Sequence, residues 1–462
     1  MKTTTVVHTS VMDEIGNTPM HQISRIDTGK CRILLKLENQ NPGGSIKDRI
    51  GKVMIEAAEA DGSLKPGATI VEATAGNTGL GLALSAAQKG YQLLIVVPDK
   101  MAQEKVFHLR AMGAEVLTTR SDVGKGHPEY YQDMAERLAR ENGHFYANQF
   151  GNPANPLAHE QTTGPEILAQ CESVGGPPDA IVCGVGSGGT MTGLSRFFAE
   201  KSPATEMVLA DPEGSVLADY VNSGYLADEA GSWMVEGIGE DFLPPILDLS
   251  RVKNAYTISD GEAFDTARTL LQKEGILGGS SSGTLLAAAL KYARAQTTAK
   301  TIVTFVCDSG NKYLSKMFND YWMMDNGFSH APHKGDLRDL VSRRHAEHQT
   351  VIVQPGTTLA QAYKNMKLHN ISQLPVMDNG ALVGLLDEED LLLHVYRSKG
   401  FEGVAADIMV KNLKTVDADE NIENVLSILT RGMVVPVVHE GQFQGLITKI
   451  DVLNHLRLTQ GS

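Results

Sequence analysis

The sequence predicts an α/β fold with parallel sheets, followed by a smaller module built from two similar halves. From about Val11 to Asp320, apolar strand-like runs alternate with helix-like segments, which is typical of parallel sheets covered by helices. Beyond residue 336, the chain repeats itself with a period of about 61 residues. At 462 residues, the chain is long enough for two or three domains, each with its own core.

The composition is that of an ordinary globular protein and argues against several partners. Apolar residues make up 42% of the chain and charged residues 21%, and the formal net charge is −14. Such an acidic chain does not favour nucleic acid or an anionic membrane as a partner. No basic leader followed by an apolar run opens the sequence, and no uncharged apolar stretch reaches the length of a membrane span. We therefore expect a cytoplasmic location.

The cysteines are widely scattered and form no Cys-x-x-Cys pair. Each lies in or beside an apolar run, and the four are Cys31, Cys171, Cys183 and Cys307. This pattern predicts buried free thiols, with neither disulfides nor a bound metal.

The first predicted strand, turn and helix place a lysine at an unusual position. Residues 33–38 predict a strand, Asn41–Arg49 a turn, and residues 50–58 a helix, because apolar residues return there at helical spacing. Ser45 is the predicted N-cap, so Lys47 lies in the first turn of the helix. The helix dipole disfavours an ammonium group there and favours the neutral, nucleophilic amine that Schiff-base chemistry requires. A solvated surface lysine is the alternative.

The following segments continue the alternation of strands and helices. Further strands are predicted at residues 69–72, 93–98, 115–119, 180–185, 207–210 and 302–307, and a helix at 103–112. The 93–98 run is continuously apolar, as expected for a central parallel strand covered on both faces. The ligand-binding loops should gather beyond the carboxyl ends of these strands.

A glycine-rich loop, Gly184–Thr190, follows a strand and opens a helix predicted at 191–199. Consecutive glycines let backbone N–H groups close around an anion at the positive end of that helix, so the loop predicts a phosphate-binding site. The loop also matches G-x-G-x-x-G, and Asp211 follows about 22 residues after Gly189, so a nicotinamide dinucleotide is an alternative ligand. A glycine turn that merely allows close helix packing is another.

A serine-rich loop, Leu277–Thr284, precedes a helix predicted at 285–293. Taken alone, its serines are more simply explained as helix caps. Together, however, a first-turn lysine, an asparagine in the loop 73–79, a phosphate cradle and a serine loop are the parts that a pyridoxal phosphate site needs. Their joint presence is more specific than any one of them.

The repeat pairs residues of the same type in both copies, which are Pro375 with Pro436, Gly384 with Gly445, Asp390 with Asp451, and His394 with His455. Copies this short bury their apolar faces best against each other, so we predict one paired module. The predicted bounds are 1–323 for the catalytic region, 324–336 for a linker, 337–397 for the first repeat and 398–462 for the second.

Residues from about 10 to 320 resemble the β-replacement family of fold-type-II pyridoxal phosphate enzymes, which contains cysteine synthase and cystathionine β-synthase. The resemblance rests on Asn41–Arg49 with Lys47, on Thr74–Gly79, on Gly186–Thr190, and on Glu274–Leu277 leading to Ser281. It implies two α/β subdomains with parallel sheets and the cofactor in the cleft between them.

The resemblance also implies the role of each cofactor residue. Lys47 would hold pyridoxal 5′-phosphate as a Schiff base, Asn77 would meet its phenolic oxygen, and Ser281 would face the pyridine nitrogen. The phosphate would be bound by Gly186, Ser187, Gly188, Gly189 and Thr190. A neutral serine at the pyridine nitrogen suits β-elimination and addition, and it discourages transamination.

For the first substrate, the resemblance implies that the carboxylate is bound by Thr74, Ala75, Thr78 and Gln149. Ala75 departs from the serine that is commoner in the family, so only its backbone N–H can serve. Lys47 would take the Cα proton and later return it.

The sequence carries mixed signals about the thiol that adds. Asp211–Ser215, Val235–Pro244 and Asn155–His159 resemble the cystathionine β-synthase branch, whereas Thr162–Ile167 resembles cysteine synthases. We hypothesise that Glu236, with Gly237 beside it, orients the amino group of homocysteine; a solvated acidic turn at residues 236–241 is the alternative. Glu240 stands where several relatives have tyrosine.

The predicted reaction is therefore the condensation of L-serine with L-homocysteine to L-cystathionine, as part of transsulfuration, with release of hydrogen sulfide from cysteine left open. Cysteine synthesis from O-acetylserine and sulfide is the first alternative. A nicotinamide oxidoreductase and a purely regulatory protein with an inactive catalytic fold are the others. We expect small amino acids as substrates and a homodimer or homotetramer as the assembly.

The repeated module resembles a pair of cystathionine β-synthase domains, a Bateman module, which cysteine synthases usually lack. Thr448 and Asp451 match the motif in which the aspartate holds a ribose hydroxyl of an adenosyl ligand, so control by S-adenosylmethionine is a hypothesis. Asp387 occupies the threonine position in the first copy. Simple capping of the closing helices is the alternative. No Cys/His pair lies within the first thirty residues, so the resemblance predicts no haem, and His8 and His21 are expected to be ordinary surface residues.

Overall fold

The computed structural model describes residues 7–74, 76–99, 103–124, 126–227, 229–329, 334–398, 400–432 and 434–460. The chain divides into two compact units, Met1–Phe318 and Asn319–Ser462, here called the first and the second unit. None of the helices described is long and apolar enough to cross a membrane. All four cysteines are free.

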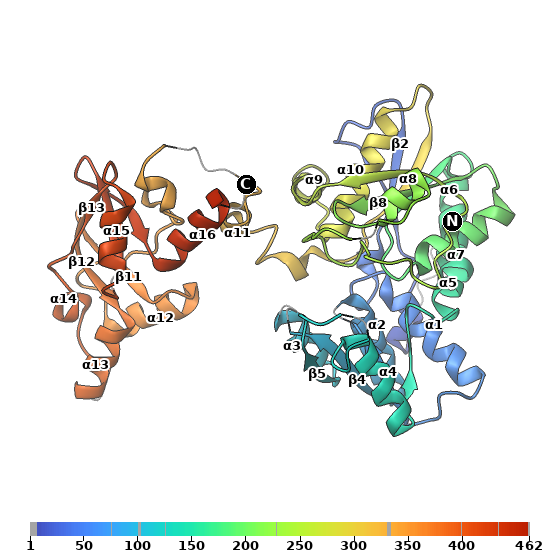
Figure 1. The fold of residues 1–462 in the computed structure, drawn as a ribbon, viewed down its shortest axis with the longest axis horizontal. Helices are drawn as coiled ribbons and strands as arrows, with labels where there is room; N and C mark the ends of the chain where they lie inside the picture. The colour runs from blue at the N-terminus through green and yellow to red at the C-terminus, as the bar shows by residue number, and fades with distance from the viewer. Residues whose placement is uncertain are drawn as a thin grey trace. The chain divides into compact units, whose positions relative to one another are not determined.

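The first unit contains two sheets, as Figure 1 shows, and both are built mainly from parallel strands. The larger sheet has the order β1 (Met20–Gln22), β2 (Arg32–Lys36), β10 (Thr301–Phe305), β7 (Ala180–Cys183), β8 (Glu206–Pro212) and β9 (Val252–Ile258), and only β1 is antiparallel to its neighbour. The smaller sheet is parallel throughout, with the order β5 (Glu115–Thr119), β4 (Gln92–Pro98), β3 (Thr69–Ala73) and β6 (Phe145–Tyr146). The predicted α/β class with parallel sheets is thus confirmed.

The helices of the first unit follow the strands in the expected alternation. They are α1 (Lys47–Ala60), α2 (Asn77–Lys89), α3 (Gln103–Ala111), α4 (Tyr131–Asn142), α5 (Ala154–Ala158), α6 (Gly164–Glu172), α7 (Gly189–Lys201), α8 (Leu217–Ser223), α9 (Asp260–Glu274) and α10 (Ser280–Arg294). Figure 1 shows α2 and α4 beside β4 and β5 at one end of the unit, with α8, α9 and α10 beside β2 and β8 at the other.

Three predicted helix starts are corrected by the structure. Ile46, and not Ser45, precedes the first helical residue of α1, and Ser45 Oγ accepts a hydrogen bond of 3.3 Å from Lys47 N. The helices α7 and α10 begin at Gly189 and Ser280, earlier than predicted. Glycine and serine loops carry no apolar periodicity, so the pattern cannot reveal that their backbone is already helical.

Close packing of two helices brings two predicted site residues together. A Cβ added to Gly51 on α1 would lie 2.4 Å from the carbonyl carbon of Gly81 on α2, and one on Gly81 would lie 2.5 Å from Lys47 O. Only glycine permits backbones to approach this closely. As a result, the first residues of both helices, Lys47 and Asn77, line one cavity.

A buried ionic network ties α1 to α6. Arg49, which is 2% exposed, pairs with Glu38 at 2.7 Å and with Glu166 at 2.7 Å. Lys36 Nζ also donates to Glu166 Oε2 at 2.7 Å. Burial alone would raise the pKa of Glu38, but Arg49 beside it holds that pKa below its usual range. Removing one member would leave an uncompensated buried charge.

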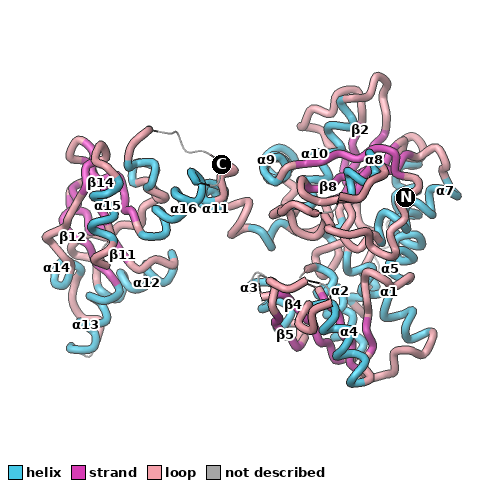
Figure 2. The backbone as a smooth tube through the Cα atoms, viewed as in Figure 1, coloured by secondary structure: helices cyan, strands magenta, loops and turns pink. Residues whose placement is uncertain are grey.

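The second unit contains the predicted repeat. Its strands form two sheets, β11 (Gln373–Asp378) with β12 (Ala381–Asp387), and β13 (Val416–Asp417) with β14 (Val435–His439) and β15 (Gln442–Ile447). The helices are α11 (Asp320–Asp325), α12 (Leu359–His369), α13 (Glu388–Ser398), α14 (Ala405–Ile408), α15 (Ile422–Leu429) and α16 (Lys449–Gln460). Figure 2 shows the strands of both copies together, with helices around them. One buried apolar cluster is formed by residues 353–405, and the other joins the second copy to Leu337, Leu340 and Val341.

Candidate active site

A cavity of about 380 Å³ in the first unit gathers the predicted site residues, a size typical of small-molecule sites. The predicted residues on its wall are Lys47, Thr74, Asn77, Thr78, Gln149, Gly186, Ser187, Gly188, Gly189, Thr190, Glu236, Gly237 and Ser281. Ala75 lies outside the described residues. Segments separated by more than two hundred residues thus meet at one place.

The loop Gly186–Thr190 forms a tight cradle at the start of α7. Gly188 has a φ of +92°, a conformation that favours glycine, and a Cβ on Gly189 would lie 1.8 Å from Asn155 Oδ1. Asn155 Nδ2 donates to Ser187 Oγ at 2.9 Å and supports the loop from behind. The backbone N–H groups at the positive end of this 13-residue helix are therefore available to an anion such as phosphate.

His159 also supports this cradle, although the sequence did not identify it as a site residue. Its Nε2 lies 3.2 Å from Thr190 Oγ1, and its Nδ1 lies 3.0 Å from Thr163 Oγ1. Burial lowers the pKa of His159 to about 3, helped by the positive charges of Arg49 and Lys47. The imidazole is therefore neutral at physiological pH and acts as a hydrogen-bonding support.

Lys47 is the first residue of α1, and its side chain faces the cavity. Burial lowers its pKa, against the opposing influence of Cys307, Asp308 and Glu240. Its amine forms no hydrogen bond or ion pair with any residue that the structure describes. A lysine with these properties is suited to Schiff-base chemistry.

Asn77 and Ser281 are both held by partners within the fold. The Asn77 amide donates from Nδ2 to Asp308 at 2.8 Å, and its Oδ1 accepts from Lys312 Nζ at 2.6 Å. Ser281 lies in the first turn of α10, not in a loop, and its hydroxyl contacts the thiol of Cys307. Both side chains line the cavity.

Thr74, Thr78 and Gln149 cluster on the wall formed by the smaller sheet and α2. The Thr78 hydroxyl donates to Gln149 Oε1 at 2.6 Å, and both residues are buried. This contact orients the amide of Gln149 so that its nitrogen remains as a donor. Donors of this kind are suited to a substrate carboxylate.

Glu236 forms ion pairs with two lysines that the sequence did not identify. Its carboxylate contacts Lys105 Nζ, and it accepts from Lys316 Nζ at 2.6 Å. Burial alone would raise the pKa of Glu236, but the two lysines hold it below its usual range. The Glu236 backbone N–H donates to Ser280 Oγ at 3.0 Å, which fixes the loop. We call Lys105, Glu236 and Lys316 the charged cluster.

Glu240 is a half-buried acid on the same wall. Burial raises its pKa to about 9, and the carboxylates of Asp241 and Asp211 add to the effect. The backbone of Glu240 is fixed by Ser215, whose Oγ accepts from Glu240 N at 3.1 Å. Its carboxyl group has no hydrogen-bond partner among the residues described.

The dinucleotide alternative does not suit this structure. Asp211 Oδ2 accepts a hydrogen bond of 2.8 Å from Ala218 N at the start of α8, and Asp211 is fully buried. Its carboxylate is therefore used within the fold and is not presented to a ribose. The unpaired Lys47 amine, the phosphate cradle and the serine facing the cavity fit pyridoxal phosphate instead.

In the second unit, Thr448 and Asp451 line a cavity of about 660 Å³. Asp451 Oδ2 accepts from Thr448 N at 2.7 Å and from Thr448 Oγ1 at 2.5 Å, and Asp451 Oδ1 contacts Ser342 Oγ. The aspartate thus caps α16, and it also lies on a cavity wall. In the first copy, Asp390 N donates to Asp387 Oδ1 at 2.8 Å.

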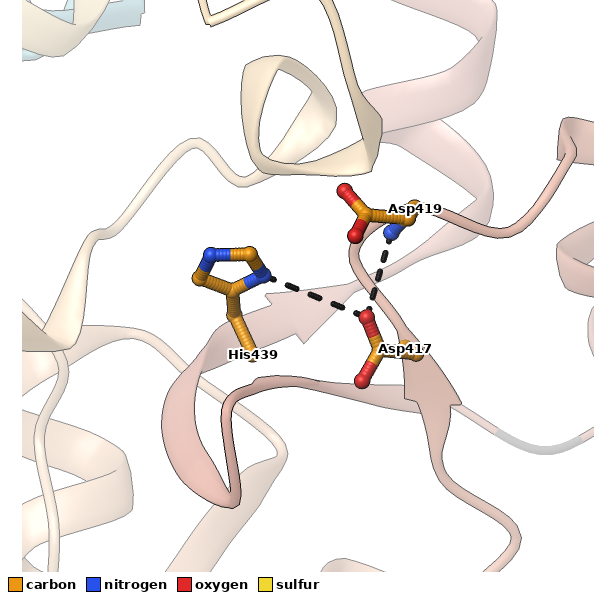
Figure 3. A group of neighbouring side chains, drawn as sticks. All are labelled: Asp417, Asp419 and His439. Atoms are coloured by element: carbon orange, nitrogen blue, oxygen red, sulfur yellow. Dashed lines mark hydrogen bonds and ion pairs between the residues drawn. The ribbon is translucent and has the colours of Figure 1, made fainter.

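A group of three possible metal ligands was not predicted. Figure 3 shows Asp417, Asp419 and His439, whose ligand atoms lie within 4.8 Å of one another. Both carboxylates are exposed, and His439 Nδ1 lies 3.9 Å from Asp417 Oδ1. Exposed acidic groups of this kind are common without a metal, so the group alone does not define a site.

Comparison with known proteins agrees with the geometry of both units. Residues 11–308 match the pyridoxal-phosphate dependent enzyme family, and residues 338–397 and 404–458 each match the CBS domain. The cystathionine beta-synthase of Dictyostelium discoideum is 35% identical over 468 residues, which cover 98% of this chain and 93% of that protein.

Two solved structures resemble the first unit. A hydrogen sulfide-producing enzyme from Fusobacterium nucleatum is 39% identical with a TM-score of 0.61, and the match covers 67% of this chain and all of that one. An O-acetylserine dependent cystathionine beta-synthase from Helicobacter pylori is 37% identical with a TM-score of 0.61, covering 67% of this chain and 98% of that one. The chain therefore belongs to the cystathionine β-synthase family of pyridoxal-phosphate dependent enzymes and carries a pair of CBS domains.

Proposed function

We propose that the first unit condenses L-serine with L-homocysteine to L-cystathionine, with release of water. The charged cluster would determine which acceptor binds in the cavity. Homocysteine is a zwitterion, and its carboxylate and ammonium groups complement Lys105 and Glu236 on the cavity wall. Sulfide has no ammonium group for Glu236 to bind.

The residues around the cavity divide the task of holding cofactor and substrate. The Gly186–Thr190 loop would bind the phosphate of pyridoxal 5′-phosphate, and Ser281 and Asn77 would contact its ring. When bound, this cofactor supplies an electron sink that acidifies the Cα–H of an amino acid attached to it. The Thr74 hydroxyl, the amide nitrogen of Gln149 and the backbone N–H of Thr78 would bind the substrate carboxylate, because the Thr78 hydroxyl donates to Gln149.

Lys47 would move the proton at Cα. Because burial lowers its pKa, the neutral amine that accepts a proton is more accessible than in an exposed lysine. The same amine, once protonated, would return the proton to Cα when the thiol has added to Cβ. The apolar wall formed by Ile46, Leu285 and Phe305 limits the entry of water.

O-acetylserine is the alternative donor, because the Helicobacter pylori relative is described as O-acetylserine dependent. The test is product analysis with serine, O-acetylserine or cysteine offered against homocysteine and sulfide. Cystathionine as the fastest product from serine and homocysteine supports the proposal. Cysteine as the fastest product, from O-acetylserine and sulfide, would contradict it. The Lys47→Ala variant is the control for uncatalysed reaction, and a visible spectrum without a Soret band would support the absence of haem.

The role of Glu236 has a separate test. Glu236→Ala should raise KM for homocysteine and leave KM for the donor nearly unchanged, because the first substrate is bound by other residues. The matched control is Glu213→Ala, which removes a carboxylate outside the cavity wall. An unchanged KM for homocysteine would exclude the role.

We also propose that the second unit binds an adenosyl ligand such as S-adenosylmethionine in the 660 Å³ cavity, with Asp451 meeting a ribose hydroxyl. The match to CBS domains supports this proposal. Isothermal titration of the full chain should show binding heat that Asp451→Asn removes. The absence of binding heat with adenosyl ligands would contradict the proposal. Light scattering after size exclusion would test the predicted homodimer or homotetramer.

A further inference from the structure

The amide of Asn77 is held in one orientation by two groups of opposite character. Asp308 is a carboxylate that only accepts hydrogen bonds, and it faces Asn77 Nδ2 at 2.8 Å. Lys312 donates from Nζ to Asn77 Oδ1 at 2.6 Å. A flipped amide would set its NH₂ group against the ammonium and its oxygen against the carboxylate. The pair therefore excludes the flip.

The two holding groups are themselves fixed. Asp308 is 1% exposed, and its Oδ2 also accepts from Tyr313 OH at 2.8 Å. Lys312 lies over the turn that precedes the Lys47 helix, because a Cβ on Gly44 would lie 3.9 Å from Lys312 Nζ. Burial lowers the pKa of Lys312, and the carboxylates of Asp308 and Asp48 oppose this effect and favour the charged form. The network thus links the start of α2 to the segment after β10.

The orientation of the Asn77 amide determines which of its hydrogen-bonding groups remains free to contact a ligand in the cavity. Its oxygen is occupied by Lys312, and one of its two N–H bonds is occupied by Asp308. One N–H donor is left for a ligand in the cavity that Asn77 lines. A donor at this position is complementary to an anionic oxygen.

We infer that Lys312 and Asp308 are positioning residues, which present Asn77 as a hydrogen-bond donor to the phenolic oxygen of the cofactor. The inference rests on the cofactor in the proposed function and does not depend on the choice of donor or thiol. Without Lys312, the amide can rotate and turn its own oxygen toward the phenolate, which is repulsive.

The test is a double-mutant cycle on cofactor binding in the full-length protein. The dissociation constant of pyridoxal 5′-phosphate and the visible absorption maximum of the bound cofactor are measured for wild type, Lys312→Met, Asn77→Ala and the double variant. Lys312→Met should weaken binding about tenfold, the scale of a lost hydrogen bond to a charged group, and should shift the absorption maximum. In the Asn77→Ala background, the same change should have an effect of about twofold or less, because Lys312 acts through Asn77.

Equal effects of Lys312→Met in both backgrounds, or no effect in either, would overturn the inference. If Lys312→Met does not fold, Lys312→Gln takes its place, because glutamine lacks the charge and can accept as well as donate. Lys273→Met is the matched control, since Lys273 is exposed and does not line the cavity. It should leave cofactor binding and the absorption maximum unchanged. Failure of the proposed acceptor would appear in Glu236→Ala, and failure of this inference in Lys312→Met.

Discussion

The protonation of Glu240 gives a pH dependence of stability that can be worked out from the structure. Burial raises the pKa of this acid to about 9 from an ordinary value of 4.5. Between these two values the folded chain keeps a proton that the unfolded chain releases. Stability is therefore unaffected below the unfolded pKa and decreases as pH rises toward the folded pKa. Each pH unit costs about 1.4 kcal/mol for one such group, which is about 4 kcal/mol from pH 5 to 8.

Glu240→Gln removes this dependence, because glutamine imitates the protonated acid and does not titrate. The free energy of unfolding of the variant minus that of wild type should therefore increase by about 1.4 kcal/mol per pH unit between pH 5 and 8. Urea titrations in a Trp322→Phe background can measure it, because the remaining Trp233 lines the same cavity as Glu240. The exposed Glu229→Gln is the matched control. Parallel pH curves for Glu240→Gln and wild type would show that Glu240 is charged in the folded protein, and the reasoning from burial would be wrong.

Three further predictions concern the cradle, the buried network and the second unit. Gly189→Ala should lose bound cofactor, measured by visible absorbance, because its Cβ would collide with Asn155 at 1.8 Å; Gly356→Ala, with open space around it, should not. Arg49→Met should lower the free energy of unfolding by about 3–5 kcal/mol, because Glu38 is left buried without its partner. Both changes can be measured by scanning calorimetry: Lys89→Met, which removes the partly exposed pair with Glu59, should cost no more than about 1 kcal/mol. Equal losses for Arg49→Met and Lys89→Met would contradict the prediction. Asp451→Ala should lower the temperature of the thermal transition of the second unit even without ligand, because it removes the acceptor that caps α16. An unchanged transition temperature would show that the cap contributes little.

The sequence by itself determined the fold class, the repeat and many of the residues that line the cavity. These are local features, because a strand, a glycine loop and a helix that follow one another are formed by consecutive residues. Lys47, Asn77 and the Gly186–Thr190 loop could all be identified in this way. The resemblance to a family then assigned them a common cofactor, and all of them line one cavity.

Only the tertiary structure decided which residues support them. Asn155 packs behind Gly189, Lys105 reaches Glu236, and Lys312 reaches Asn77, although each pair is far apart in sequence. No periodicity or spacing encodes such contacts, because they depend on how the sheets and helices pack. The same packing determines charge states, since a half-buried acid such as Glu240 takes its protonation from its surroundings and not from its neighbours in the chain.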